Sequence, residues 1–127
     1  MGASKAFAGN FFEDSKLGAH LVHATPRTVT EGDRALYIGL TGARHLLHCS
    51  AAAAQAIGYP DAPMDDVLVF HMVFGKSVPD ISLNAVANLG YADCRFHRPV
   101  FAGDTLAADS KVIGLRENSN GETGTVW

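Results

Sequence analysis

The residues with the clearest potential for chemistry lie in one short stretch, residues 41–50, with the sequence TGARHLLHCS. It contains the guanidinium of Arg44 and two imidazoles, those of His45 and His48. Because an imidazole titrates near neutral pH, His48 is a candidate general acid or base; a structural or solvent-facing histidine is the alternative. A metal site is not indicated, since the chain has no HExxH or CxxC pattern and no carboxylate pair beside these histidines.

A second candidate is the start of a long predicted helix, at residues 62–67. The backbone N–H groups of Asp66 and Val67 would point outward there and carry partial positive charge. Such groups can bind a carbonyl oxygen as it becomes an oxyanion. The alternative is an ordinary helix start, in which Asp65 and Asp66 simply complement the helix dipole.

A third candidate is a set of cations suited to the phosphates of a nucleotide-bearing cofactor: Lys76, Arg95 and Arg98. Both arginines belong to the segment RFHRPVFAGDTL, whose Pro99 and Gly103 favour a tight turn. Solvated surface charges are the alternative for each of them.

The other histidines, His20, His23, His71 and His97, form no grouping that the sequence reveals. For His71, on the predicted long helix, a hydrogen-bonded core histidine is the favoured interpretation.

Length and composition predict a single folded domain. The chain has 127 residues, of which 47% are hydrophobic and 18% charged, and a net charge of −3. This excludes intrinsic disorder and argues against binding nucleic acid as the main role. No apolar run approaches a membrane span, no secretory signal is evident, and Cys49 and Cys94 form no disulfide framework, so a cytoplasmic protein with reduced thiols is expected.

Three helices are predicted from their start and stop signals. The first begins after the capping residue Thr30 and ends at Gly42. A short helix begins at Ser50 and ends at Gly58 and Pro60. The longest covers residues 63–78 and is stopped by Pro79; because it is apolar nearly all round, it is expected to be buried on most faces.

Strands are predicted at residues 20–30, 83–100 and 105–115, and another begins at residue 123 after a hairpin at 118–121. The turn at 101–104 contains Gly103. An antiparallel sheet around the long helix satisfies this order, since that helix has no polar face to present to water. We therefore expect an α+β domain over residues 11–127, incomplete at its C-terminus, after a flexible tail at 1–10.

Three segments resemble the MaoC-like dehydratase family. FFEDSKLG is similar to the family's opening FEDF-x-x-G, RPVFAGDTL to its turn PV-x-x-GDTL, and TGARHLLHCS to its hydratase loop TGD-x-NP-x-H-x-D. Within the family, the segments HATPRTVTEGD, DDVLVFHMVFGK, VPDISLNAVANLGYA and VIGLRENSN resemble 2-methylfumaryl-CoA (mesaconyl-CoA) hydratases, in particular their N-terminal half.

The resemblance implies a hotdog fold, an antiparallel sheet wrapped around a central helix, and reversible addition of water to an enoyl-CoA. Coenzyme A would be part of the substrate, so no separate cofactor and no metal are expected. By the resemblance, helix-terminal amides, here those of Asp66 and Val67, would polarise the thioester carbonyl. Arg44, Lys76, Arg95 and Arg98 are expected to bind CoA because of their charge, not from a match to family positions. Members of the subfamily have two hotdog halves, so a second half or a homo-oligomer is the expected partner, with neither nucleic acid nor membrane.

The chain departs from the family pattern at its most important position. The family's loop aspartate falls on Ala43, its asparagine on His45 and its proline on Leu46, and only its histidine has a counterpart, His48. Alanine can neither accept a proton nor orient water, so the catalytic pair is incomplete.

The sequence therefore predicts part of a hydro-lyase that interconverts 2-methylfumaryl-CoA and beta-methylmalyl-CoA, with this half structural and CoA-binding. The alternatives are a noncatalytic acyl-CoA-binding or dimerisation module and, less favoured, a hotdog thioesterase using Asp65 or Asp66.

Overall fold

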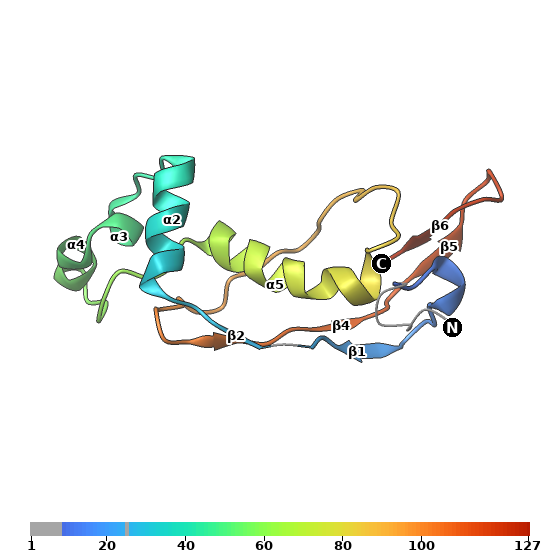
Figure 1. Ribbon diagram of the computed structural model, residues 1–127, viewed down its shortest axis with the longest axis horizontal. Coiled ribbons are helices and arrows are strands. Elements are labelled where there is room, and N and C mark those ends of the chain that lie inside the picture. The colour runs from blue at the N-terminus through green and yellow to red at the C-terminus, as the bar shows by residue number, and fades with distance from the viewer. Residues whose placement is uncertain (1–8, 25) are drawn as a thin grey trace, which may run out of the picture. The chain divides into compact units, whose positions relative to one another are not determined.

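The computed structural model describes residues 9–24 and 26–127; most of the tail predicted at 1–10 lies outside this range. The chain divides into two compact units, one of residues 1–25, 74–90 and 108–127, the other of residues 26–73 and 91–107. In chain order the elements are η1 (Phe12–Asp14), β1 (His20–Val22), β2 (Arg27–Thr28), α2 (Glu31–Thr41), α3 (Leu46–Cys49), α4 (Ala51–Ala56), α5 (Asp66–Ile81), β3 (Thr105–Leu106), β4 (Asp109–Lys111), β5 (Leu115–Glu117) and β6 (Gly124–Val126) (Figure 1).

The predicted bounds of helix α2 are confirmed, and hydrogen bonds at both ends explain them. Thr30 accepts a hydrogen bond from the Asp33 amide, and the Asp33 carboxylate accepts one from the Thr30 amide at 2.9 Å, which forms a capping box. At the other end Gly42 takes a left-handed conformation with φ 65°, and its N–H donates to the carbonyl of Ile38. A residue with a Cβ is strained in that conformation, so glycine ends the helix there.

The helix predicted after Ser50 is confirmed as α4, whose first turn is capped by the Ser50 hydroxyl accepting from the Ala53 amide. Residues 41–50 lie between two predicted helices and were expected to form a loop; this expectation is partly wrong, because the stretch contains the short helix α3. Helices α2, α3 and α4 belong to one unit, where they lie together (Figure 1).

The predicted bounds of the long helix are wrong by three residues at each end. Helix α5 begins at Asp66 because the chain before it is extended, with the Met64 amide bonded to the carbonyl of Val100 at 2.7 Å. It continues through Pro79 to Ile81. A proline removes one backbone hydrogen bond and its ring crowds the preceding turn, but so close to the end of the helix this does not stop the last two residues, 80 and 81, from continuing it. The predicted burial is also wrong, since no residue of α5 is buried.

The predicted strand at 20–30 is two short strands, each with a different partner. Strand β1 pairs antiparallel with β4, with Leu21 opposite Ser110. Strand β2 pairs antiparallel with β3, with Thr28 opposite Thr105. The strand predicted at 105–115 is likewise divided into β3, β4 and the start of β5. The turn predicted before β3 is confirmed, with Gly103 at φ 97° and the Asp104 carboxylate accepting from the Phe101 amide.

The strand predicted at 83–100 is wrong, because the structure has no strand there and residues 83–99 are all exposed. Local hydrogen bonds replace a sheet ladder: the Asn88 side chain accepts from the Gly90 amide, and Asp93, at φ 54°, pairs with Arg95. Such short-range bonds compete with strand pairing, and an alternating sequence does not become a strand without a partner.

The hairpin predicted at 118–121 is confirmed by β5 and β6, which pair antiparallel around a turn containing Gly121 at φ 69°. Helix η1 packs against this hairpin, and a Cβ on Gly124 would lie 2.2 Å from the Phe12 ring. The absence of a side chain at Gly124 is therefore what allows the close approach.

One buried polar network was not foreseen from the sequence. The side chain of His23 is completely buried, with Nδ1 at 2.7 Å from a carboxylate oxygen of Asp80 and Nε2 at 2.8 Å from the hydroxyl of Ser110. These three residues come from the chain after β1, the last turn of α5 and β4, so the imidazole ties three separate segments of one unit together. His23 is a hydrogen-bonded core histidine.

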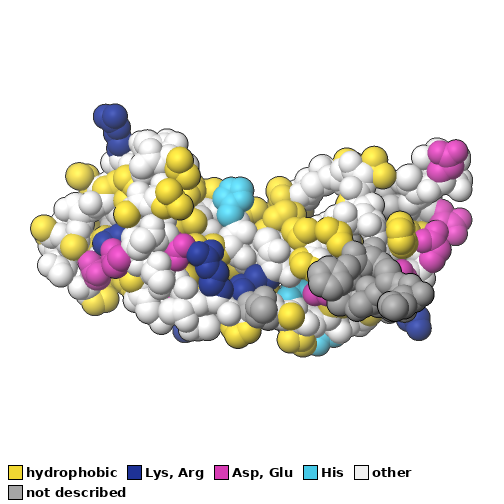
Figure 2. All heavy atoms as spheres, in the orientation of Figure 1, with side chains coloured by type: hydrophobic (Ala, Val, Ile, Leu, Met, Phe, Trp, Pro, Cys, Tyr) yellow, Lys and Arg dark blue, Asp and Glu magenta, His cyan; other side chains and the backbone are white. Residues whose placement is uncertain are grey.

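The buried hydrophobic core of the described residues is small: Val29, Ala54, Ala62, Met64 and Val112. Many large hydrophobic side chains are exposed instead, including Val86, Leu40 and Leu89 at 89%, 78% and 76%, and yellow side chains are accordingly spread over the face seen in Figure 2. No described helix is both long and apolar enough to cross a membrane.

We expect His23→Leu to lower the free energy of unfolding by roughly 2 kcal/mol, because it leaves Asp80 and Ser110 without their shared partner. His20→Leu is the matched control, since His20 lies three residues earlier, on β1, but is exposed and pairs with the exposed Asp109. Urea denaturation of both variants measures the difference. Equal losses in the free energy of unfolding would show that the buried network stabilises the fold no more than the exposed pair does.

The capping box predicts a pH-dependent contribution from Asp33. The Thr30 amide, by donating to the carboxylate, holds the pKa of Asp33 below its ordinary value, and Arg27 lowers it further. A lowered carboxyl pKa stabilises the fold above the unfolded pKa, and that stability is lost as the pH falls through the folded pKa. Asp33→Ala should therefore cost about 1 kcal/mol at pH 7 and progressively less below about pH 4, measured by denaturation at each pH. A pH-independent loss would contradict this origin.

Candidate functional site

The structure places His48 beside the segment that leads into α5. His48 Nδ1 lies 3.0 Å from the carbonyl oxygen of Pro63. A carbonyl can only accept a hydrogen bond, so Nδ1 carries the proton of the neutral ring and Nε2 keeps its lone pair. The half-buried imidazole is thus oriented with the chemistry of a base at its second nitrogen.

The segment between α4 and α5 that receives His48 is held from several directions. Arg34 on α2 donates to the carbonyl of Ala62 at 2.9 Å, and the Met64 amide donates to the carbonyl of Val100 at 2.7 Å. Ala62, Pro63 and Met64 are all buried. These bonds fix the position at which α5 begins.

The first amides of α5 differ in their availability. The Asp65 carboxylate accepts a hydrogen bond from the Val67 amide at 2.8 Å, so that predicted oxyanion donor is already engaged. Within the described residues no hydrogen bond engages the Asp66 amide, which makes it the better placed of the two predicted donors. Asp65 therefore serves as the helix cap, the alternative that the sequence left open.

Tyr37 on α2 lies close enough to Asp65 to be affected by its charge, although no sequence motif pointed to this residue. Burial, and to a lesser extent the negative charge of Asp65, raise the pKa of the Tyr37 phenol above its ordinary value. The phenol is consequently a neutral hydrogen-bond donor at physiological pH.

The loop that precedes α3 contains the position where the family aspartate is replaced. Ala43 accepts a hydrogen bond from Cys49 Sγ at 3.2 Å, and its own amide donates to the Thr41 hydroxyl at 3.3 Å. His45 is exposed, and its ring centroid lies 5.3 Å from that of His48. The loop thus brings His45 and His48 together with no carboxylate at position 43. Both Cys49 and Cys94 are free and exposed.

The four predicted CoA-binding cations are not gathered into one described cluster. Arg95 forms an ion pair with Asp93 at 2.8 Å, whereas Arg44 and Arg98 are exposed. These three lie in the unit of residues 26–73 and 91–107, which contains α2, α3 and α4 and is here called the helical unit. Lys76 lies on the part of α5 that belongs to the other unit. Their role in binding CoA stays a prediction.

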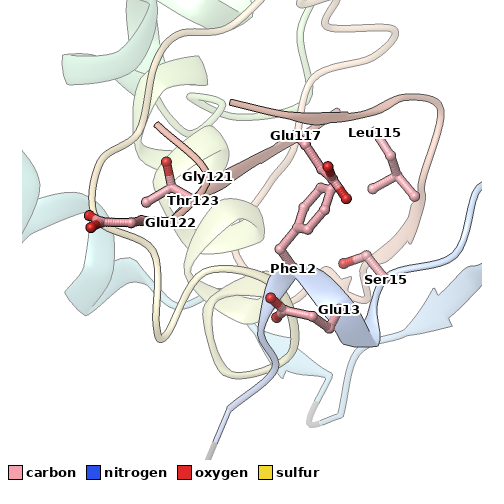
Figure 3. A pocket seen from close by; sticks show the side chains of 8 residues that line it. All are labelled: Phe12, Glu13, Ser15, Leu115, Glu117, Gly121, Glu122 and Thr123. Carbon is pink, nitrogen blue, oxygen red and sulfur yellow. The ribbon is translucent and has the colours of Figure 1, made fainter. Parts of the chain in front are cut away.

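A cavity of about 390 Å³ lies in the unit that contains the β5–β6 hairpin, bordered by side chains of η1, β5 and the following turn (Figure 3). Its lining includes three carboxylates, those of Glu13, Glu117 and Glu122. Concentrated negative charge repels phosphate groups, so this cavity is unsuited to the nucleotide end of a CoA thioester.

The model of the MaoC like domain matches residues 13–126, nearly the whole described chain. The chain belongs to this family. The matched range includes the loop of Ala43 and His48 and the start of α5.

Two curated relatives are similar along almost the entire chain. The mesaconyl-CoA hydratase of Cereibacter sphaeroides is 62% identical over 123 residues, which are 97% of this chain and 36% of the relative. The beta-methylmalyl-CoA dehydratase of Chloroflexus aurantiacus is 60% identical over 125 residues, 98% of this chain and 36% of the relative. The chain thus spans about a third of the length of the curated relatives it matches.

Solved structures confirm the predicted hotdog fold. A MaoC domain dehydratase from Chloroflexus aurantiacus superimposes with a TM-score of 0.94 at 60% identity, over 98% of this chain and 35% of the other. A protein from Archaeoglobus described as a monoamine oxidase regulatory protein gives 0.79 at 28% identity, over 93% of this chain and 79% of the other.

We expect Asp65→Asn to lower the pKa of Tyr37 only partly, because burial, the larger cause of the raised pKa, remains while the negative charge is lost. Asparagine also caps helices, so α5 should keep its start. Phenolate absorbance during an alkaline titration measures the change, with Tyr37→Phe to assign the signal among the three tyrosines. A return to the ordinary tyrosine pKa would mean that charge, not burial, dominates.

Proposed function

We propose that this chain is part of an enoyl-CoA hydratase that reversibly hydrates 2-methylfumaryl-CoA (mesaconyl-CoA) to beta-methylmalyl-CoA, and that the part described here packs and binds CoA rather than catalysing the reaction. The substrate is taken from the names of two relatives that are 62% and 60% identical to this chain. The observation that carries this proposal is Ala43, the third residue of the loop at 41–50, where the resembling family has aspartate.

Hydration requires that water lose a proton as its oxygen bonds to one alkene carbon, while the other carbon gains a proton and the π bond is lost. In the proposed reaction, an amide at a helix start stabilises the negative charge that develops on the thioester oxygen. The Asp66 amide has the position for that part, and His48 Nε2 has the lone pair to receive a proton. A carboxylate that would hold and orient the water is missing at position 43.

We further propose that a second hotdog half, or another copy in a homo-oligomer, completes the protein. The exposed hydrophobic side chains support this, since a folded domain rarely leaves so many large apolar groups in water. The CoA phosphates are assigned to three of the predicted cations, Lys76, Arg95 and Arg98. A cytoplasmic location fits an acyl-CoA substrate and two free cysteines.

A noncatalytic acyl-CoA-binding or dimerisation module is the second candidate. The missing carboxylate at position 43 supports it as well as it supports the first proposal. A thioesterase is supported less, because Asp65, one of the two carboxylates near the helix start, is engaged with the Val67 amide.

The proposal is tested by measuring hydration of mesaconyl-CoA by residues 1–127 alone, and by a chimera in which they replace the corresponding third of the Cereibacter sphaeroides mesaconyl-CoA hydratase. We expect the chain alone to be nearly inactive, because the loop carboxylate is absent, and the chimera to be active. His48→Ala should change the kcat of the chimera by less than about tenfold.

Robust turnover by the chain alone that is abolished by His48→Ala would overturn the proposal that this part binds CoA without catalysing hydration. A chimera that binds CoA thioesters but hydrates none would instead favour the noncatalytic module.

A further inference from the structure

The helical unit contains an unusual distribution of charge around its loop. Between Asp33 and Asp61 the sequence contains no aspartate or glutamate, while it contains Arg34, Arg44 and the two loop histidines. The replacement of the family aspartate by Ala43 completes this absence. The loop is therefore a place where a negatively charged group meets no repulsion from the loop itself.

Arg34 is not available to such a group, since its guanidinium binds the Glu31 carboxylate and the carbonyl of Ala62. Arg44 differs: it is exposed, and within the described residues its guanidinium has no ion-pair or hydrogen-bond partner. Its backbone position is nevertheless defined, because the left-handed Gly42 precedes it and the neighbouring Ala43 is bonded on both sides.

The carboxylates that follow in the same unit are largely engaged with backbone amides. Asp61 accepts from the Ala62 amide at 2.7 Å, and Asp65 accepts from the Val67 amide at 2.8 Å. Asp66 is exposed at the first position of α5. Neither Asp61 nor Asp65 therefore pairs with Arg44, whose guanidinium is open to an external anion.

The hydrogen bond between His48 and Pro63 brings this loop to the segment that begins α5. If the Asp66 amide binds the thioester oxygen, groups on the acyl chain are only a few bonds away from it. The CoA phosphates lie beyond the whole pantetheine arm. A guanidinium on this loop is therefore suited to the acyl end of the substrate, and its planar pair of N–H donors matches a carboxylate.

We infer that Arg44, assisted by His45, binds a free carboxylate on the acyl group, so that this loop selects thioesters of dicarboxylic acids. The inference rests on the proposed function and refines the role of Arg44, from a contact to CoA phosphates to a specificity determinant. Because residue 43 is alanine and not aspartate, no carboxylate at that position repels an anion bound by the loop.

The test is the binding of two saturated four-carbon thioesters to the 127-residue chain by titration calorimetry. Succinyl-CoA has a free carboxylate and butyryl-CoA has none, and neither has a double bond to hydrate. We expect succinyl-CoA to bind about tenfold more tightly. Arg44→Gln should remove this preference and leave butyryl-CoA binding unchanged. Lys16→Gln, which removes an exposed cation elsewhere in the chain, is the matched control and should leave both affinities unchanged.

Three results would count against the inference in different ways. Equal binding of the two thioesters by the unmodified chain would overturn it while leaving the proposed function intact. An equal loss for both thioesters in Arg44→Gln would overturn it in favour of a contact to CoA itself. Failure of both thioesters to bind would contradict the proposed CoA binding. Circular dichroism of Arg44→Gln excludes unfolding as the cause of any loss.

Discussion

The helical unit depends on the way that residues 61–65 are held between α4 and α5. Arg34 binds this segment from α2, His48 binds it from α3, and Met64 bonds to Val100, which leads into the turn before β3. Ala62, Pro63 and Met64 are buried, so the backbone groups of these three residues need partners inside the protein. Because the start of α5 follows directly, the same bonds that satisfy the segment also set the position of the first helical amides.

This arrangement explains how one histidine can be both structural and chemically competent. The bond from His48 to Pro63 is part of what holds the segment, and it is also what leaves Nε2 without a proton. In the proposed function, Ala43 stands at the position of the family aspartate, so orientation of the histidine is separated from activation of water. The hydrogen bonds of the loop serve the fold and do not depend on a carboxylate at position 43. A binding role for the loop is therefore the role that we propose.

Local signals in the sequence were reliable where local interactions decide the outcome. Thr30 with Asp33, Gly42 and Ser50 set the ends of their helices through bonds within a few residues, and Gly103 and Gly121 shape their turns in the same way. Strands were predicted less well, because a strand forms only against a partner. Residues 83–99 have suitable residue types but no ladder, and the stretch 20–30 is divided between two different partners. Pro79 is a local signal that failed: we predicted that it would stop α5, but it lies in the last turn of the helix, which continues to Ile81.

The sequence by itself determined the family and the hotdog fold, because motifs are properties of the linear chain, and the identity of residue 43 is likewise what leads us to propose an incomplete catalytic pair. Only the tertiary structure decided which side chains meet. His23, Asp80 and Ser110 are separated by 57 and 30 residues along the chain, and no pattern in the sequence links them. The Nε2 base of His48 and the engagement of the Val67 amide likewise depend on hydrogen bonds formed in the fold. A residue type fixes what a group can donate or accept, whereas its partners are set by folding in three dimensions.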